Sequence, residues 1–279
     1  MNVQWYPGHM TKAIRMMQAD IKLIDLVIEL IDARIPMSSR NPDIDELSKG
    51  KSRLILLNKS DLADEAKNKA WLRYFTDKGL VTLLLDSKNR KGFAEINRSI
   101  EEACKAKLER DRARGITGRP VRAMVVGIPN VGKSTFINSF TRRASTKTGN
   151  KPGVTKGKQW IKINKSLELL DTPGILWPKF ENDSIGLNLA FIGSINDEIL
   201  DEAELSIKLI EYLASDYQGV LAGRFDIDES KAPVEVLENI AQKRGCIKKG
   251  GAPDYDKAAR IVLDEFRSGK LGRITLEVP

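Results

Sequence analysis

One eight-residue segment combines two glycines, a lysine and a serine at a fixed spacing. Gly127–Ser134 reads GIPNVGKS and fits the pattern G-x-x-x-x-G-K-[S/T]. It lies between the apolar run Val121–Val126 and a stretch of helical periodicity, so it would join a strand to a helix. Backbone N–H groups of such a loop and the positive end of the helix dipole bind phosphate oxygens. A chance match in a glycine-rich loop is the alternative, and the flanking elements argue against it.

The side chains of this loop predict individual roles in holding a nucleotide. We expect Lys133 to bridge the outer phosphates as a catalytic residue, and the Ser134 hydroxyl to bind Mg²⁺. The residues predicted to complete the phosphate site are Asn130, Val131, Gly132 and Thr135.

A second segment, Asn58-Lys59-Ser60-Asp61, follows the apolar run Leu54–Leu57. The Asp61 carboxylate can accept hydrogen bonds from guanine N1–H and the exocyclic amine, a donor pair that adenine lacks. Lys59 can lie along the face of the purine. Alone the tetrapeptide is a weak signal, and a helix N-cap at Ser60 or Asp61 is the alternative. A phosphate loop in the same domain favours guanine binding.

Asp171-Thr-Pro-Gly174 closes a third apolar run, Leu167–Leu170. We expect Asp171 to hold the Mg²⁺ shell through water and the Gly174 N–H to contact a γ-phosphate. A simple β-turn is the alternative.

Two weaker signals complete the set. Thr155 ends the glycine-containing segment Asn150–Thr155, and its hydroxyl would complete the Mg²⁺ shell when a triphosphate is bound. Asp86 and Ser87 follow the run Val81–Leu85 and would brace the base.

Together these segments resemble the G1 to G5 motifs of translation-factor-type GTPases. Their order is unusual, with G4 at 58, G5 at 86, G1 at 127, G2 at 155 and G3 at 171, so the chain resembles a circularly permuted GTPase. Asp32–Pro36, Ser39–Pro42, the N-terminal WYPGHM and the C-terminal GGAPDYDKAARIVLDEFRSGKLGRITLE are similar to the ribosome biogenesis GTPase A (RbgA, YlqF) family. This resemblance covers essentially the whole chain.

The elements that must position these motifs alternate between strands and helices, which predicts a mostly parallel sheet with helices on both faces. Further strands are predicted at Leu26–Ile31 and Trp160–Ile163, and helices at about 10–24, 65–77, 92–110 and 133–140. After Pro178 only helical patterns follow, at about 184–193, 198–214, 233–244 and 254–268. We therefore predict an α/β GTPase domain at 1–178, with a basic linker at Asp111–Pro120, and an all-helical RNA- or ribosome-binding domain at 179–279.

Permutation changes what the chain termini do. After Gly174 the chain leaves for the helical domain, so the helix at about 10–24 and the strand Leu26–Ile31 should fill the vacated places. A γ-phosphate that orders 171–178 would then reorient the helical domain.

The group that orients the attacking water cannot come from the residue directly after D-x-x-G, where many GTPases have it. Many GTPases place a Gln directly after D-x-x-G to orient water, and this chain has Ile175 there. His9 is the single histidine and lies in the segment that permutation brings near the γ-phosphate. The family resemblance supports a catalytic His9, which predicts a low intrinsic rate until a partner orders it. A mobile surface histidine is the alternative.

Asn130 carries a separate hypothesis. In GTPases with a similar G1 sequence, this Asn is associated with a K⁺ ion that replaces the charge of an arginine finger. A plain loop Asn is the alternative.

The net charge of +8 is the sum of opposed blocks. Residues 101–165 hold sixteen basic and four acidic side chains, and 181–240 hold three basic and fourteen acidic. Basic clusters at Arg142–Lys158 and at Lys243, Arg244, Lys248 and Lys249 lack interleaved aromatics, which favours phosphate contacts with folded RNA. A role of the charge in solubility alone is the alternative.

The family resemblance implies GTP and GDP as ligands and the immature large ribosomal subunit, with its RNA and proteins, as partner. Another RNA target, in the small subunit or in tRNA modification, is the second reading, and a scaffold without hydrolysis is the third. We expect a monomer.

Composition excludes several classes. Two cysteines exclude a disulfide framework and a Cys-rich zinc module, and one histidine excludes a His-based metal cluster. No run approaches the roughly 18 apolar residues of a membrane span, and the N-terminus does not fit a signal peptide. We expect a cytoplasmic protein.

Overall fold

The structure is a computed structural model that describes residues 8–116, 118–141, 160–177, 180, 182–197 and 200–279, apart from the side chains of residues 8 and 9. The chain divides into two compact units. The first unit holds the described residues from 8 to 180 together with Thr275–Pro279. The second unit holds the described residues from 182 to 274.

The first unit is built on one sheet. In the described part of the chain, six strands lie in the order β3-β2-β1-β4-β6-β5. Neighbouring strands are parallel except β5 and β6, which are antiparallel. The strands are β1 (Leu26–Asp32), β2 (Ser52–Asn58), β3 (Val81–Leu84), β4 (Val121–Val126), β5 (Trp160–Lys162) and β6 (Leu167–Asp171). The predicted mostly parallel sheet is confirmed.

Strand β1 lies where permutation requires a replacement strand. It is hydrogen-bonded between β2 and β4, with Leu26 opposite Ala123 of the strand that leads into the phosphate loop. Every residue of β1 is buried, as expected for a central parallel strand.

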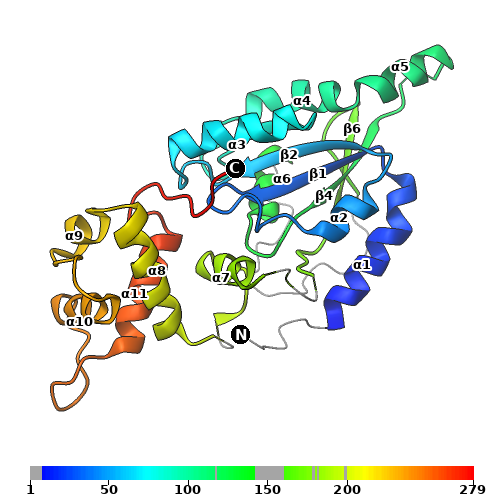
Figure 1. Ribbon diagram of the computed structural model, residues 1–279. Coiled ribbons are helices and arrows are strands. Elements are labelled where there is room, and N and C mark those ends of the chain that lie inside the picture. Colours follow the sequence, from blue (N-terminus) through cyan, green and yellow to red (C-terminus); the bar gives the residue numbers. More distant parts are fainter. Residues whose placement is uncertain (1–7, 117, 142–159, 178–179, 181, 198–199) are drawn as a thin grey trace. The chain divides into compact units, whose positions relative to one another are not determined.

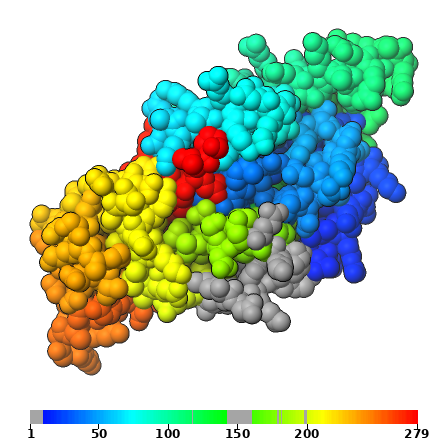
Figure 2. Space-filling view, viewed as in Figure 1, coloured from blue at the N-terminus to red at the C-terminus, as the bar shows by residue number. Residues whose placement is uncertain are grey.

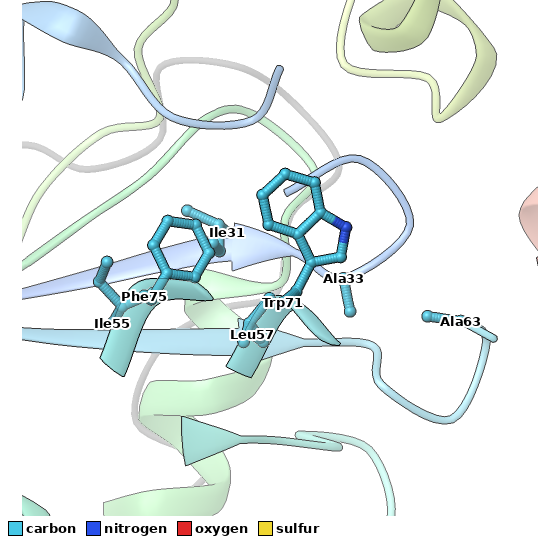
Figure 3. Packing of buried hydrophobic residues seen from close by; sticks show 7 residues of the cluster. All are labelled: Ile31, Ala33, Ile55, Leu57, Ala63, Trp71 and Phe75. Carbon is cyan, nitrogen blue, oxygen red and sulfur yellow. The ribbon is translucent and has the colours of Figure 1, made fainter. Parts of the chain in front are cut away.

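Helices lie on both sides of this sheet, with α4 and α5 along one side and α1 and α2 on the other (Figure 1). The helical segments are α1 (Gly8–Asp20), η1 (Ile21–Leu23), α2 (Pro42–Leu47), α3 (Glu65–Asp77), η2 (Phe93–Glu95), α4 (Ile96–Ala103), α5 (Lys105–Ala113) and α6 (Lys133–Thr141). Figure 3 shows Trp71 and Phe75 of α3 against Ile31 and Ile55 of β1 and β2, in a cluster of fully buried side chains. This packing holds α3 against β2, the strand that ends at the segment 58–61.

Two predicted boundaries differ from the structure. The single helix at 92–110 is split into η2, α4 and α5, with a break at Cys104. Helix α5 then continues to Ala113, into the segment predicted as a linker. Polar residues dominate α5, and the ion pair Lys107–Asp111 (2.8 Å) supports it one turn apart.

The second unit is helical. Its helices are α7 (Asp183–Phe191), α8 (Glu202–Asp216), α9 (Val220–Phe225), α10 (Pro233–Lys243) and α11 (Tyr255–Arg267). Helices α8, α10 and α11 pack against one another. Arg267 joins α11 to the end of α7, because its guanidinium pairs with Asp197 at 2.7 Å and donates to the carbonyls of Ala190 and Phe191.

The C-terminal residues do not follow the predicted domain limits. Thr275–Pro279, placed with the helical domain in the sequence analysis, belong to the first unit. Figure 2 shows their red atoms against the cyan atoms of α3. Backbone and side-chain hydrogen bonds to Arg34 and Asp64 hold this segment, and neither leaves a periodic pattern in the sequence.

No helix within the described ranges is long and apolar enough to cross a membrane.

Candidate functional site

The segment Gly127–Ser134 forms a tight loop between β4 and α6. Three of its residues have positive φ angles: Gly127 (154°), Asn130 (59°) and Gly132 (100°). A Cβ on Gly127 would lie 2.5 Å from the Leu30 carbonyl oxygen, and one on Gly132 would lie 2.6 Å from Asn58 Nδ2. Both glycines are therefore required by close contacts with β1 and β2.

Lys133 is folded back onto this loop. Its side chain is buried and Nζ donates to the carbonyl oxygens of Gly127 and Ile128, each at 2.9 Å. Burial lowers the pKa of Lys133 to about 8, against the opposing charge of Asp171. Ser134 and Thr135 are exposed at the start of α6. The loop thus holds a buried cation at the start of a helix, an arrangement that suits an anion.

Asn58 joins three of the predicted motifs. Its Nδ2 donates to the Val131 carbonyl of the phosphate loop at 2.8 Å. Its Oδ1 accepts from the Ser87 backbone N–H at 3.1 Å and from the Ser87 hydroxyl at 2.8 Å. The structure thus brings together segments that begin at 58, 86 and 127, at the carboxyl ends of β2, β3 and β4.

The two carboxylates beside this junction differ in their surroundings. Asp86 caps its own turn by accepting from the backbone N–H groups of Lys88 and Asn89. Partial desolvation and the nearby Asp86 charge raise the pKa of Asp61. Two donors from a guanine edge would stabilise the charged form of Asp61.

The alternative interpretation of 58–61 as a helix start is wrong. The N-cap of α3 is Asp64, whose carboxylate accepts from the Lys67 backbone N–H at 2.9 Å. Ser60 and Asp61 precede this cap, and the Ser60 N–H donates to the Leu85 carbonyl.

The segment after β6 rests on the phosphate loop. A Cβ on Gly174 would lie 2.8 Å from Lys133 Nζ and 2.9 Å from Pro129 Cα. The Ile175 N–H donates to the Gly127 carbonyl at 3.4 Å. Burial raises the pKa of Asp171, and the charge of Lys133 opposes this rise. Gly174 is therefore packed closely against Lys133 and Pro129 of the phosphate loop.

Ile175 lines a pocket of about 330 Å³. Residues of α1 (Ile14, Met17) and α2 (Ile44) line the same pocket. The helix that the sequence placed beside the switch segment is therefore found there, and the Ile175 side chain, 2% exposed, is unable to orient a water molecule.

Two predicted site residues lie outside this description. His9 falls in the first turn of α1, but its side chain is not among the described ones. Thr155 and the basic cluster Arg142–Lys158 lie in the undescribed segment 142–159.

The second basic cluster is divided by its ion pairs. Lys243 pairs with Asp226 at 2.6 Å. Arg244 pairs with the buried Glu265, which also binds Arg224 in a two-bond contact. Lys248 lies 4.0 Å from Asp256, and all four basic side chains of the cluster are exposed, so the ion pairs reduce its charge without burying it.

Sequence reasoning gave no role to a buried ion network beneath Lys59. Lys59 Nζ lies 3.0 Å from Asp32, and Arg34 donates to both oxygens of that carboxylate at 2.8–2.9 Å. Burial alone would raise the pKa of Asp32, but the charges of Arg34 and Lys59 hold it well below its usual range. A charged residue at the carboxyl end of a buried parallel strand is a signal that points to this edge of the sheet.

The sheet order and the site define a circularly permuted P-loop GTPase. A family model described as a 50S ribosome-binding GTPase matches residues 122–240. Ribosome biogenesis GTPase A of Bacillus cereus is 46% identical over 100% of this chain and 95% of the relative, and that of Priestia megaterium is 47% identical over 100% and 98%. The crystal structure of GNP-bound YlqF from T. maritima aligns with a TM-score of 0.69 at 28% identity, over 96% of this chain and 98% of that one. The chain belongs to the ribosome biogenesis GTPase A family and is a GTP-hydrolysing enzyme.

Nucleotide binding should take up protons near pH 8. Lys133 has a pKa of about 8 in the nucleotide-free protein, and bound phosphates favour its charged form. Uptake should approach half a proton at about pH 8 and fall toward zero at about pH 7, and affinity should decrease as pH rises above 8. Calorimetric titration with GDP in two buffers of different ionisation enthalpy measures the uptake. Equal apparent enthalpies in both buffers at pH 8 would contradict the assigned pKa.

Proposed function

We propose that this chain is an assembly factor that binds the immature large (50S) ribosomal subunit in its GTP state and leaves after hydrolysis, promoting late maturation of the subunit. The observation that carries the proposal is the similarity to ribosome biogenesis GTPase A along the full chain. The family model that matches residues 122–240 is described as a 50S ribosome-binding GTPase, and 50S denotes the same subunit.

The contact of Gly174 with the phosphate loop supports nucleotide gating. Gly174 and Ile175 touch Lys133 and Gly127, and the chain runs from there toward α7 after a few residues. Binding of a γ-phosphate changes the surroundings of Lys133, so it biases the path of the chain that enters the helical unit.

His9 and Lys133 are the proposed catalytic residues. Ile175 leaves the position after D-x-x-G without a polar side chain, and α1, whose first turn contains His9, lies beside Ile175. An imidazole there orients or deprotonates the attacking water once a partner fixes the N-terminal segment. Hydrolysis is therefore slow in isolation and stimulated by the ribosomal subunit.

The proposed nucleotide contacts follow the motif residues. Asp61 and Lys59 bind the guanine, Asn58, Ser60, Asp86 and Ser87 hold that pocket in shape, and the phosphate loop with Gly174 binds the phosphates. GTPases in general require Mg²⁺, and the hydroxyl and carboxylate of Ser134 and Asp171 are the oxygen donors that this ion prefers. Asp171 fits this role because burial raises its pKa, and a nearby cation would offset that cost. Thr155 would add a third oxygen.

Two basic segments of the sequence would meet ribosomal RNA: residues 142–158 and the cluster of Lys243, Arg244, Lys248 and Lys249. Without interleaved aromatics they fit phosphates of folded RNA better than stacked single-strand bases. The protein would act as a cytoplasmic monomer. A different RNA target, in the small subunit or in tRNA modification, is the outcome that would replace this proposal.

Sedimentation with ribosomal particles tests the partner. The protein should pellet with immature large subunits in the presence of a non-hydrolysable GTP analogue and should not pellet with GDP. The Asp61→Asn variant is the matched control, because an amide cannot accept from both guanine donors, so the GTP analogue should no longer drive binding. Pelleting with small subunits, or capture of free tRNA instead, would contradict the proposal.

Replacement of His9 tests the catalytic group. His9→Ala should slow single-turnover GTP hydrolysis on large subunits by about 10²–10⁴-fold, because a positioned base is lost. The affinity for GTP and the binding to subunits should stay unchanged. A stimulated rate equal to that of the wild type would refute the role.

A comparison of monovalent salts tests the K⁺ site proposed at Asn130, which is exposed at a positive φ angle in the phosphate loop. Hydrolysis should be faster in KCl than in NaCl of equal ionic strength, and Asn130→Ala should remove the difference. An equal rate of the wild type in both salts would remove K⁺ from the mechanism.

A further inference from the structure

The last residues of the chain form a short strap on the first unit, Thr275–Glu277. The Glu277 carboxylate accepts from the backbone N–H groups of Met37 (2.7 Å) and Ser38 (3.0 Å), and also from the Ser38 hydroxyl. The Leu276 N–H donates to the Arg34 carbonyl at 2.8 Å. One edge of the strap is therefore bound to the loop 33–39.

The other edge of the strap is bound to α3. Thr275 Oγ1 accepts from the Asp64 backbone N–H at 3.0 Å, and the Thr275 carbonyl accepts from Lys67 Nζ at 2.9 Å. The Glu277 carbonyl accepts from Trp71 Nε1 at 3.3 Å. The strap thus joins the loop after β1 to the helix that follows the segment 58–61.

From that loop the contacts continue to the base-recognition segment. Asp32 is fully buried, and its backbone N–H donates to the Ser39 hydroxyl at 2.9 Å. Its carboxylate accepts from the Arg34 guanidinium and lies 3.0 Å from Lys59 Nζ. Each step from Glu277 to Lys59 is a hydrogen bond, an ion pair or a turn of fewer than eight residues.

We infer that the C-terminal strap is a positioning element for guanine binding, which acts through the loop 33–39 and Asp32 on Lys59. The inference rests on the proposed contact of Lys59 with the purine face. Lys59 has a long side chain and a positive φ of 58°, so its conformation is costly to fix. Asp32 fixes the ammonium group, and the strap fixes the loop that holds Asp32. The aliphatic stem of Lys59 is then preorganised to cover the base.

A double-mutant cycle on GDP affinity tests this inference. Glu277→Ala should weaken GDP binding about five-fold and Lys59→Met about ten-fold or more. In the Lys59→Met background, Glu277→Ala should have no further effect, because the strap acts through that side chain. Val278→Ala is the matched control, since its side chain is 71% exposed in the same segment, and it should change nothing.

Three outcomes separate the possibilities. GDP affinity within two-fold of the wild type in folded Glu277→Ala, or a lowered melting temperature alone, would overturn the positioning role. Additive effects in the double variant would also overturn it, because a strap that merely stabilises the fold is indifferent to Lys59. An unchanged affinity in Lys59→Met would instead refute the proposed base contact on which the inference rests.

Should Glu277→Ala fail to fold, Thr275→Val and Glu277→Gln provide the same test. Thr275→Val removes the acceptor of the Asp64 N–H and keeps the shape of the side chain. Glu277→Gln keeps one side-chain oxygen, so its effect should be smaller than that of Thr275→Val and should likewise vanish with Lys59→Met.

Discussion

The hydrogen bonds of a single buried amide organise the nucleotide site. Asn58, 2% exposed, donates to the Val131 carbonyl and accepts twice from Ser87. A buried amide that lost these partners would cost about 1–3 kcal/mol for each unpaired group, so the three loops are held in one mutual arrangement. Gly132 is part of the same constraint, because a side chain there would displace Asn58 Nδ2.

This constraint explains why permutation leaves the site intact. The loops come from the carboxyl ends of parallel strands, and their mutual positions depend on strand order in the sheet rather than on order along the chain. Strand β1 completes the sheet between β2 and β4, so the connection between β6 and β1 is dispensable. The chain after β6 and the chain before β1 are therefore free to lead elsewhere, and the chain after β6 leads into the helical unit.

The motifs and strands were predictable because their signals are local. Gly127–Ser134 carries its glycines, lysine and serine within eight residues, and all six predicted strands are present with ends that shift by at most two residues. Helix α2 was missed because six residues contain too little periodicity, although Asn41 and Pro42 form an ordinary helix start. Local pattern thus identified the loops and the sheet that carries them.

Contacts between distant residues were not predictable in this way. Glu277 and Ser38 lie 239 positions apart, and their hydrogen bonds leave no spacing to detect. Likewise the basic run around Lys243 suggested a uniform RNA surface, whereas Asp226 and Glu265 pair with part of it. Charge counts along a sequence record composition, and only the fold decides which charges are already neutralised.

The two attachments of the helical unit meet different parts of the nucleotide site. One leaves from Ile175, beside the phosphate loop, and the other returns as Thr275–Glu277, which is connected to Lys59 through Arg34 and Asp32. GTP and GDP share the guanine and differ in the γ-phosphate, so hydrolysis alters the surroundings of the first attachment and leaves those of the second unchanged. Under the proposed function, hydrolysis would therefore act on the first attachment, while the second keeps its hydrogen bonds to the loop 33–39 and to α3.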